Sequence, residues 1–262
     1  MCGAMQLRAG LTFTVAPRFY NNLRWAERLQ INGGVHADHQ GVSPRQDWRS
    51  LSDQELSIVV PEAATSKTPL ASADLTAVQV GVFTIPDHLR EGWWVAIEDA
   101  DAPDGNAEGY QKFVAATIAF LQFKQLPLPE RCRFDLLARR PGQAATGAHT
   151  AEGLGGLTPD TDPGVACRLV AAINLGEELT RITLINLELS KMIAMLGERG
   201  IDAVPATAGH QFLSVFPTYP LVRVVLDPCE GLWLPETAVI LGSDTQGKQE
   251  PDIVLLVREE PC

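Results

Sequence analysis

The side chains best suited to chemistry in this chain are a few of its five histidines. His149 lies in the stretch TGAHTAEGLGG, with Glu152 three residues after it. His210 comes well downstream, and Arg223 follows it in the next strand-like segment. Two imidazoles and one carboxylate can hold a metal such as iron and leave coordination positions open for substrate and oxygen. An arginine can bind a carboxylate through two parallel hydrogen bonds.

This order of side chains resembles the iron- and 2-oxoglutarate-dependent oxygenases, over roughly residues 130–258. The resemblance implies a double-stranded β-helix fold. It implies that His149, Glu152 and His210 bind Fe(II), and that Arg223 holds the far carboxylate of 2-oxoglutarate. The expected activity is hydroxylation, or a related C–H oxidation, of a small-molecule substrate.

The first metal-ligand motif departs from the family pattern of His-x-Asp/Glu. Ala151 stands two residues after His149, and Glu152 comes one residue later. Alternate side chains of a strand share a face, so Glu152 points away from His149 unless a bulge near Gly153 intervenes. If Ala151 is the true counterpart, the carboxylate is missing, as in halogenating relatives of the family, or the metal has been lost. The alternative function is therefore a non-catalytic ligand-binding or interaction protein of the same fold.

A second histidine cluster lies upstream in the stretch GGVHADHQG, which contains His36, Asp38 and His39. His36 and Asp38 satisfy the family motif literally, and a strand would place both on one face. Only 35 residues precede His36, which leaves little room for the usual leading elements. The cluster predicts a cupin-like metal site, a contribution to substrate recognition, or a glycine-flanked polar loop.

The composition excludes several classes of partner. Of 262 residues, 45% are hydrophobic and 20% are charged, which is typical of a soluble globular protein. The net charge of −11 disfavours binding to nucleic acid or to an anionic membrane. We see no signal peptide and no run near the ~20 apolar residues of a membrane helix. Five scattered cysteines without a C-x-x-C pair predict a reducing cytoplasm. The oligomeric state stays open.

The remaining sequence predicts a β-rich α+β protein in a single domain, 1–262. Segments rich in Val, Ile and aromatic residues predict strands; they are 10–20, 56–63, 77–85, 92–99, 133–140, 166–175, 180–187, 221–227, 231–241 and 252–259. Apolar residues at helical spacing predict helices over 107–126 and 188–200. Because strands and helices do not alternate, a doubly wound parallel sheet is disfavoured. We expect a jelly-roll core over 130–262, with 1–129 as a support region.

Overall fold

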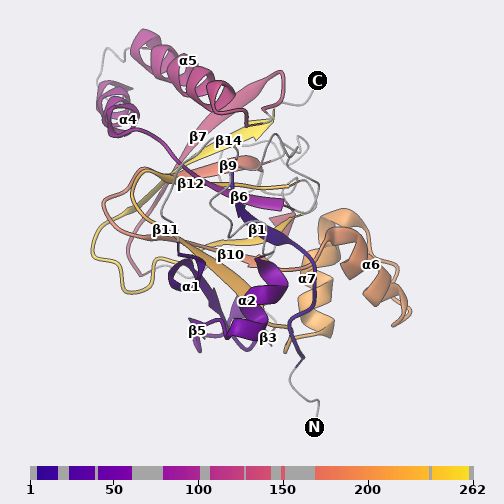
Figure 1. The fold of residues 1–262 in the computed structure, drawn as a ribbon. Helices are drawn as coiled ribbons and strands as arrows, with labels where there is room; N and C mark the ends of the chain where they lie inside the picture. The colour runs from indigo at the N-terminus through magenta and orange to yellow at the C-terminus, as the bar shows by residue number, and fades with distance from the viewer. Residues whose placement is uncertain are drawn as a thin grey trace.

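The structure, a computed structural model, describes nine segments of the chain: residues 5–16, 24–38, 41–60, 79–100, 107–126, 128–142, 149–150, 169–235 and 238–259. These segments form two six-stranded sheets that stack face to face, with helices on both outer sides (Figure 1). The protein is therefore a β-rich α+β fold, as the sequence predicts at this level.

The first sheet, called sheet A here, has the strand order β1-β6-β12-β9-β14-β7. Its strands are β1 (Thr12–Val15), β6 (Gln79–Thr84), β7 (Cys132–Arg139), β9 (Leu169–Asn174), β12 (Glu230–Trp233) and β14 (Asp252–Glu259). The pair β1 and β6 is parallel, and every other described pair in this sheet is antiparallel.

The second sheet, sheet B, has the order β5-β2-β11-β10-β13-β8 and is antiparallel throughout. Its strands are β2 (Leu29–Ile31), β5 (Arg49–Ser50), β8 (His149–Thr150), β10 (Thr180–Ile185), β11 (Leu221–Leu226) and β13 (Val239–Ser243). A separate hairpin joins β3 (Val35–Asp38) to β4 (Gly41–Pro44). Strands from residues before 130 thus extend both sheets.

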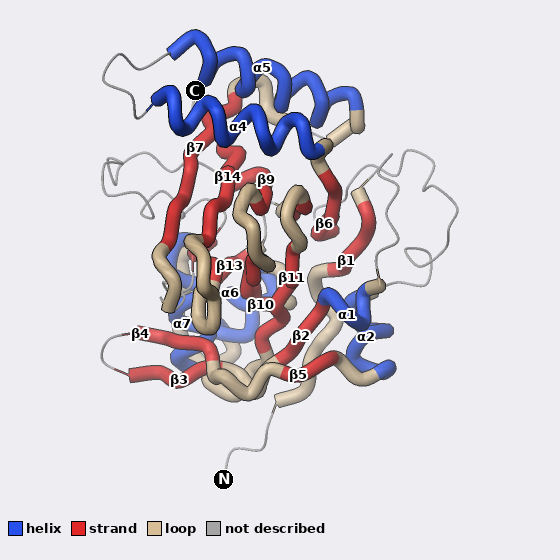
Figure 2. Tube along the Cα trace, turned by 90° about the vertical axis from the view of Figure 1, so that its left-hand side faces the viewer, coloured by secondary structure: helices blue, strands red, loops and turns tan. Residues whose placement is uncertain are grey.

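Helices cover the outer face of each sheet. Over sheet A lies a helical hairpin of α4 (Asp87–Ala100) and α5 (Ala107–Phe123), seen at the top of Figure 2. Over sheet B lie α6 (Leu189–Gly197) and α7 (Pro205–Val215). Two short helices, α1 (Trp25–Arg28) and α2 (Asp53–Val59), pack at the edge of the space between the sheets.

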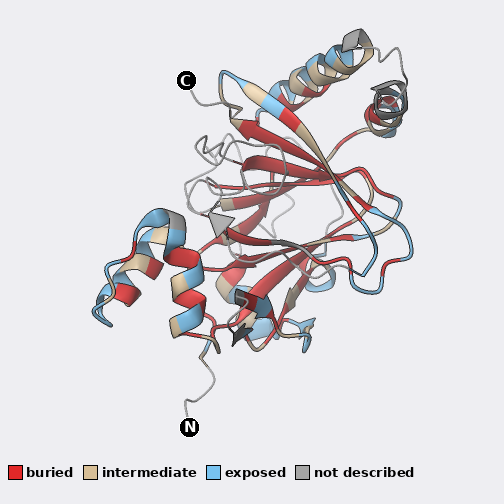
Figure 3. Ribbon diagram, turned by 180° about the vertical axis from the view of Figure 1, so that it is seen from behind, coloured by how far each residue is buried: buried red, intermediate tan, exposed pale blue. Residues whose placement is uncertain are grey.

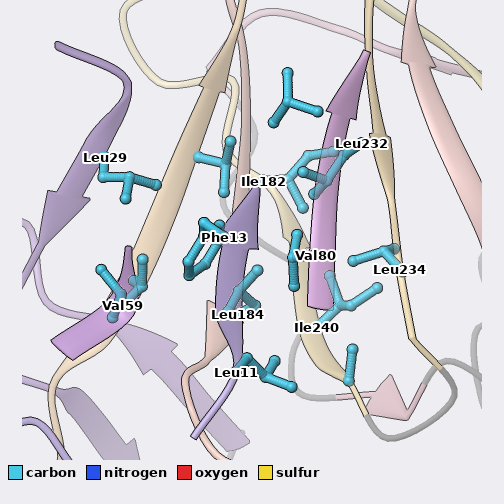
Figure 4. Packing of buried hydrophobic residues seen from close by; sticks show 14 of the residues in the cluster. Leu11, Phe13, Leu29, Val59, Val80, Ile182, Leu184, Leu232, Leu234 and Ile240 are labelled. Carbon is cyan, nitrogen blue, oxygen red and sulfur yellow. The ribbon is translucent and has the colours of Figure 1, made fainter. Parts of the chain in front are cut away.

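Apolar side chains fill the space between the sheets. Phe13 and Val80 from sheet A, with Leu11 just before β1, meet Leu184 and Ile240 from sheet B (Figure 4), and all five are at most 2% exposed. The strands are buried along most of their length, whereas the helices expose one side (Figure 3). A further apolar cluster joins each sheet to its helices. Burial of apolar area at ~25 cal/mol per Å² is the main force holding these four layers together.

Two predicted strands are helices, and these predictions are wrong. Residues 92–99 belong to α4, and residues 56–59 of the predicted strand 56–63 belong to α2, whereas 61–63 lie outside the described residues. Their aromatic and β-branched residues suit a strand, but tertiary packing overrides this weak preference. Trp93 is 1% exposed, stacks on Phe134 with ring centroids 5.9 Å apart, and donates a hydrogen bond to Thr117 of α5 at 2.9 Å. The helix preference of α2 comes from its capping box.

Beyond the α6 region, the structure differs from the prediction in one additional helix and one divided strand. Gly200 ends the α6 region with a φ of +74°, as expected for a helix stop. The helix α7 follows, begins at Pro205, and was not predicted because its run of small residues shows little periodicity. The predicted strand 231–241 divides at Pro235 into β12 and β13, which belong to different sheets. Proline has no backbone N–H group to donate to a neighbouring strand, so we expect the predicted strand to be interrupted at Pro235.

Removing the cap of α2 should destabilise the protein measurably. The Ser52 hydroxyl accepts the Glu55 N–H, and the Glu55 carboxylate accepts the Ser52 N–H. We expect Ser52→Ala to lower the free energy of unfolding by about 1 kcal/mol. Ser57→Ala, on the exposed side of the same helix, is the matched control. Urea unfolding followed by circular dichroism measures both, and equal effects of the two substitutions would contradict the prediction.

The same cap predicts a pH dependence. Arg49, above all, and then hydrogen bonds from Ser52 lower the pKa of Glu55 from 4.5 to about 2. Because the folded-state pKa is the lower one, the carboxylate stabilises the fold fully above about pH 4.5 and loses this contribution as the pH falls towards about 2. Urea midpoints across this range should therefore fall less steeply with pH in Glu55→Gln than in the unmodified protein.

Candidate functional site

Arg223, the predicted 2-oxoglutarate ligand, lies on the outer face of sheet B. Its neighbours in β11, Val222 and Val224, belong to the core between the sheets. Side chains alternate along a strand, so Arg223 points to the opposite side. There its guanidinium lies 4.0 Å from the centroid of the Trp48 ring. The predicted cosubstrate anchor therefore faces away from the space between the sheets.

The Arg223 guanidinium is already occupied by protein groups. Its Nε and Nη2 atoms donate to Gln30 Oε1 at 3.0 and 2.5 Å, and Nη1 lies 3.7 Å from Asp244 Oδ2. The residue is 7% exposed. Burial, followed by the nearby charge of Arg181, lowers the pKa of Arg223 to about 10. These contacts make Arg223 a structural clamp between β2, β11 and the loop after β13.

The register of sheet B separates Arg223 from His149. His149 pairs with Ile240, Ile240 pairs with Leu184, and Leu184 pairs with Val222. This row crosses three strand spacings, or about 14 Å at ~4.8 Å per spacing. Arg223 is one residue beyond Val222 and on the other face. In the backbone register Arg223 thus lies three strands away from His149, and its role toward a metal there stays a prediction.

The two predicted histidine ligands lie on neighbouring elements. His210 is exposed on α7, where its carbonyl oxygen accepts a hydrogen bond from Ser214 Oγ at 2.9 Å. The helix α7 packs against β8, the strand that contains His149. The side chain of His149 and all of Glu152 lie outside the described residues. The structure thus brings the two elements together without defining a ligand set.

The upstream cluster lies close to the same helix. His36 and Asp38 are in β3, and the hairpin of β3 and β4 contacts α7. His36 is exposed, whereas His39 lies outside the described residues. The described part of the chain contains no group of three or more His, Cys, Asp or Glu side chains arranged to hold a metal ion. The described elements that carry His36, Asp38 and His149 thus all contact α7, which carries His210.

A polar cavity of about 300 Å³ opens at the other end of sheet B. Three loops form it: the turn between β9 and β10, the turn after β11, and the loop between β13 and β14. Its lining residues are Glu177, Glu178, Leu179, Arg181, Pro228, Gly247 and Lys248. The volume is at the lower end of the range for small-molecule sites.

A buried ion pair forms one wall of this cavity. Lys248 Nζ donates to Asp252 Oδ1 at 2.5 Å, and the two side chains are 2% and 0% exposed. Thr180 Oγ1 donates to the same oxygen at 2.6 Å. Asp252 Oδ2 has no hydrogen-bond partner among the described residues. Buried charges are costly unless paired, so this cluster holds the loop in one conformation.

The acidic groups at the rim are also paired. Glu177 accepts a hydrogen bond from Arg90 Nη2 at 2.5 Å, and Arg90 also donates to the Leu175 and Gly176 carbonyls. The Glu178 carboxylate accepts the Gln249 N–H at 3.1 Å. Helix α4 and the loop before β14 therefore fix both ends of the β9–β10 turn.

Arg181 is the described cation of the cavity that has no acidic partner. Its one side-chain hydrogen bond among the described residues runs from Nη1 to the Gln246 carbonyl oxygen, at 3.2 Å. Arg181 is half-buried. It follows that the cavity offers guanidinium N–H groups that the protein itself does not use.

Sequence reasoning did not find this cavity. The segment SDTQGKQEP reads as a polar loop between strands, and Lys248 looks like an ordinary exposed lysine. The one available signal is the spacing of four residues between Lys248 and Asp252, which is common in solvated loops. Only the tertiary structure shows that both side chains are buried.

No family model, curated protein or solved structure matches this chain. Among the described residues, no helix is long and apolar enough to cross a membrane. The class of the protein is therefore defined by its own architecture: two stacked six-stranded sheets between two helical layers.

Proposed function

We propose that this chain is a ligand-binding or interaction protein built on a double-stranded β-helix, and that it works without an iron centre. The fold assignment is supported by the strand order. Read from one edge, sheet A begins with the order β7-β14-β9-β12 and sheet B begins with the order β8-β13-β10-β11. If β7 to β14 are numbered one to eight, these orders are 1-8-3-6 and 2-7-4-5. This is the order of a jelly roll, which pairs its strands across two sheets.

The observation that carries the functional proposal is the environment of Arg223. An anchor for 2-oxoglutarate needs free N–H groups that face the metal. The Arg223 fork instead donates to Gln30 and stacks on Trp48, on the outer face of sheet B. The residues present therefore do not fit the cosubstrate at this position, and we derive no oxidation step from it.

Anaerobic titration of the purified chain with Fe(II), with and without 2-oxoglutarate, tests this proposal. We expect no stoichiometric iron binding and no release of succinate from 2-oxoglutarate. One equivalent of iron that is lost in His149→Ala and in His210→Ala, but kept in the exposed control His88→Ala, would overturn the proposal.

The second candidate function is the iron- and 2-oxoglutarate-dependent oxygenase, and one observation favours it. Helix α7 packs on β8, so His210 and His149 are carried by elements in contact. In that case His149, Glu152 and His210 would hold the iron, which would supply the oxidising chemistry. Another group would then have to replace Arg223 as the cosubstrate anchor. Loss of iron in His36→Ala alone would instead favour the cupin-like hypothesis with His36, Asp38 and His39.

A further inference from the structure

We propose that the cavity between the β9–β10 turn and the β13–β14 loop binds a small organic molecule through an oxyanion group, held by Arg181. This inference rests on the proposed function as a ligand-binding protein and names the chemistry of its ligand. A carboxylate and a phosphate present the same pair of acceptor oxygens, so both belong to the proposed class.

Most charged side chains of the cavity lining are already paired within the protein. Lys248 is paired with Asp252, Glu177 with Arg90, and Glu178 with a backbone N–H group. Arg181 and Glu178 have no ionic partner among the described residues, but the Glu178 carboxylate accepts backbone N–H groups, whereas Arg181 keeps N–H groups that the protein does not use. Its planar fork suits two parallel hydrogen bonds to a carboxylate or phosphate.

A second guanidinium, that of the buried Arg223, lies near Arg181. Arg223 lies near enough for the charge of Arg181 to affect it, and the buried carboxylate of Asp244 is the ionic partner of Arg223, with Nη1 3.7 Å from Oδ2. The Asp244 N–H donates to the Arg181 carbonyl oxygen at 3.3 Å, which ties the acid to the same strand end. Because Asp244 is engaged by Arg223, its carboxylate forms no ion pair with the Arg181 guanidinium, which stays available for an anionic ligand.

The cavity is small, and its loops are held by ion pairs and hydrogen bonds. Its volume of about 300 Å³ holds a small metabolite rather than a polymer. Leu179 and Pro228 provide apolar surface beside the charged groups. The buried Lys248–Asp252 pair and the Arg90 clamp fix the loops before any ligand arrives, so little conformational entropy remains to be lost on binding.

Isothermal titration at low ionic strength tests the inference with three probes: succinate, inorganic phosphate and the neutral analogue succinamide. We expect succinate or phosphate to bind and succinamide not to bind. Arg181→Gln should weaken the binding at least ten-fold, because it removes a charge-assisted pair of hydrogen bonds. Arg131→Gln, which removes an exposed arginine at the far end of the β7–β14 pair, should leave it unchanged.

The three probes also separate the two oxyanion sources. Preference for succinate identifies a carboxylate ligand, and preference for phosphate identifies a phosphorylated one. Equal binding of succinamide, equal affinity in Arg181→Gln, or no binding of either anion would overturn the inference. NMR shifts of the Leu179 and Gly247 amides in the unmodified protein give a readout that does not depend on a folded variant.

Failure of this inference and failure of the proposed function are distinguishable. If no anion binds but the chain also takes up no iron, only the oxyanion site is lost. If the chain binds stoichiometric iron through His149 and His210, the proposed function is overturned whatever the cavity does. Anion binding that is unaffected by Fe(II) and weakened by Arg181→Gln supports both the oxyanion site and the proposed function.

Discussion

Replacing Lys248 with methionine should destabilise the protein by about 3–5 kcal/mol, because it leaves the Asp252 carboxylate buried without its cation. The two side chains are 2% and 0% exposed, so water cannot take the place of the lost partner. Thr180 would remain as the one described hydrogen-bond donor to Asp252. Urea unfolding at neutral pH, followed by circular dichroism, measures the loss.

A double substitution separates the ion pair from the packing around it. Lys248→Met combined with Asp252→Leu removes both charges and should recover most of the stability, since well-packed apolar groups often replace a buried ion pair without loss. Lys112→Met, on the exposed side of α5, is the matched control and should change stability by less than ~0.5 kcal/mol. A cost of under 1 kcal/mol for Lys248→Met alone would contradict the prediction.

Arg223→Met should lower the free energy of unfolding by about 2–4 kcal/mol, because it leaves buried polar groups without partners. Asp244, which is 6% exposed, loses its nearby cation, and Gln30 loses two hydrogen bonds. The stacking of the guanidinium on Trp48 contributes about 1 kcal/mol more at a site this buried. Tryptophan fluorescence during urea unfolding should report the change directly.

This substitution also distinguishes the two functional hypotheses. If Arg223 anchors 2-oxoglutarate, Arg223→Met should abolish cosubstrate binding with little effect on stability. If Arg223 is a structural clamp, the fold is weakened and binding of small anions at Arg181 persists in the folded fraction. Arg223→Lys is informative as well, since it keeps the charge but loses the fork that reaches Gln30 and Asp244. Full stability of Arg223→Lys would argue against the clamp.

The sequence predicted most strands correctly because their residues alternate or are continuously apolar. The segments 180–187 and 252–259 became β10 and β14, and the described part of 166–175 became β9, with small changes at the described ends. The helix over 107–126 is α5, and Thr117 and Leu121 of its predicted stripe are buried. Each of these signals is local, since it depends only on the period with which side chains meet the core.

The position of Arg223 depends instead on the tertiary structure, and the ligand set of His149, Glu152 and His210 stays a prediction. A common chemical role for His149, His210 and Arg223 requires that three distant segments meet on one face. Val222 and Val224 of β11 point into the space between the sheets. Arg223 lies between them in the strand and therefore points to the outer face of sheet B. Every residue of β11 is buried, because both faces of sheet B are covered. The sequence of such a strand does not show which side chains face the other sheet and which face the helices.

The sequence by itself determined the β-rich class, the positions of most strands and the acidic, globular character of the chain. These properties follow from composition and from side-chain period. The tertiary structure alone decided which polar side chains are buried and which share a cavity. Lys248 and Asp252 lie in a segment with loop composition, and Arg181 gains its setting from loops far apart in the chain. Contacts between distant segments depend on strand order and register, which no local pattern encodes.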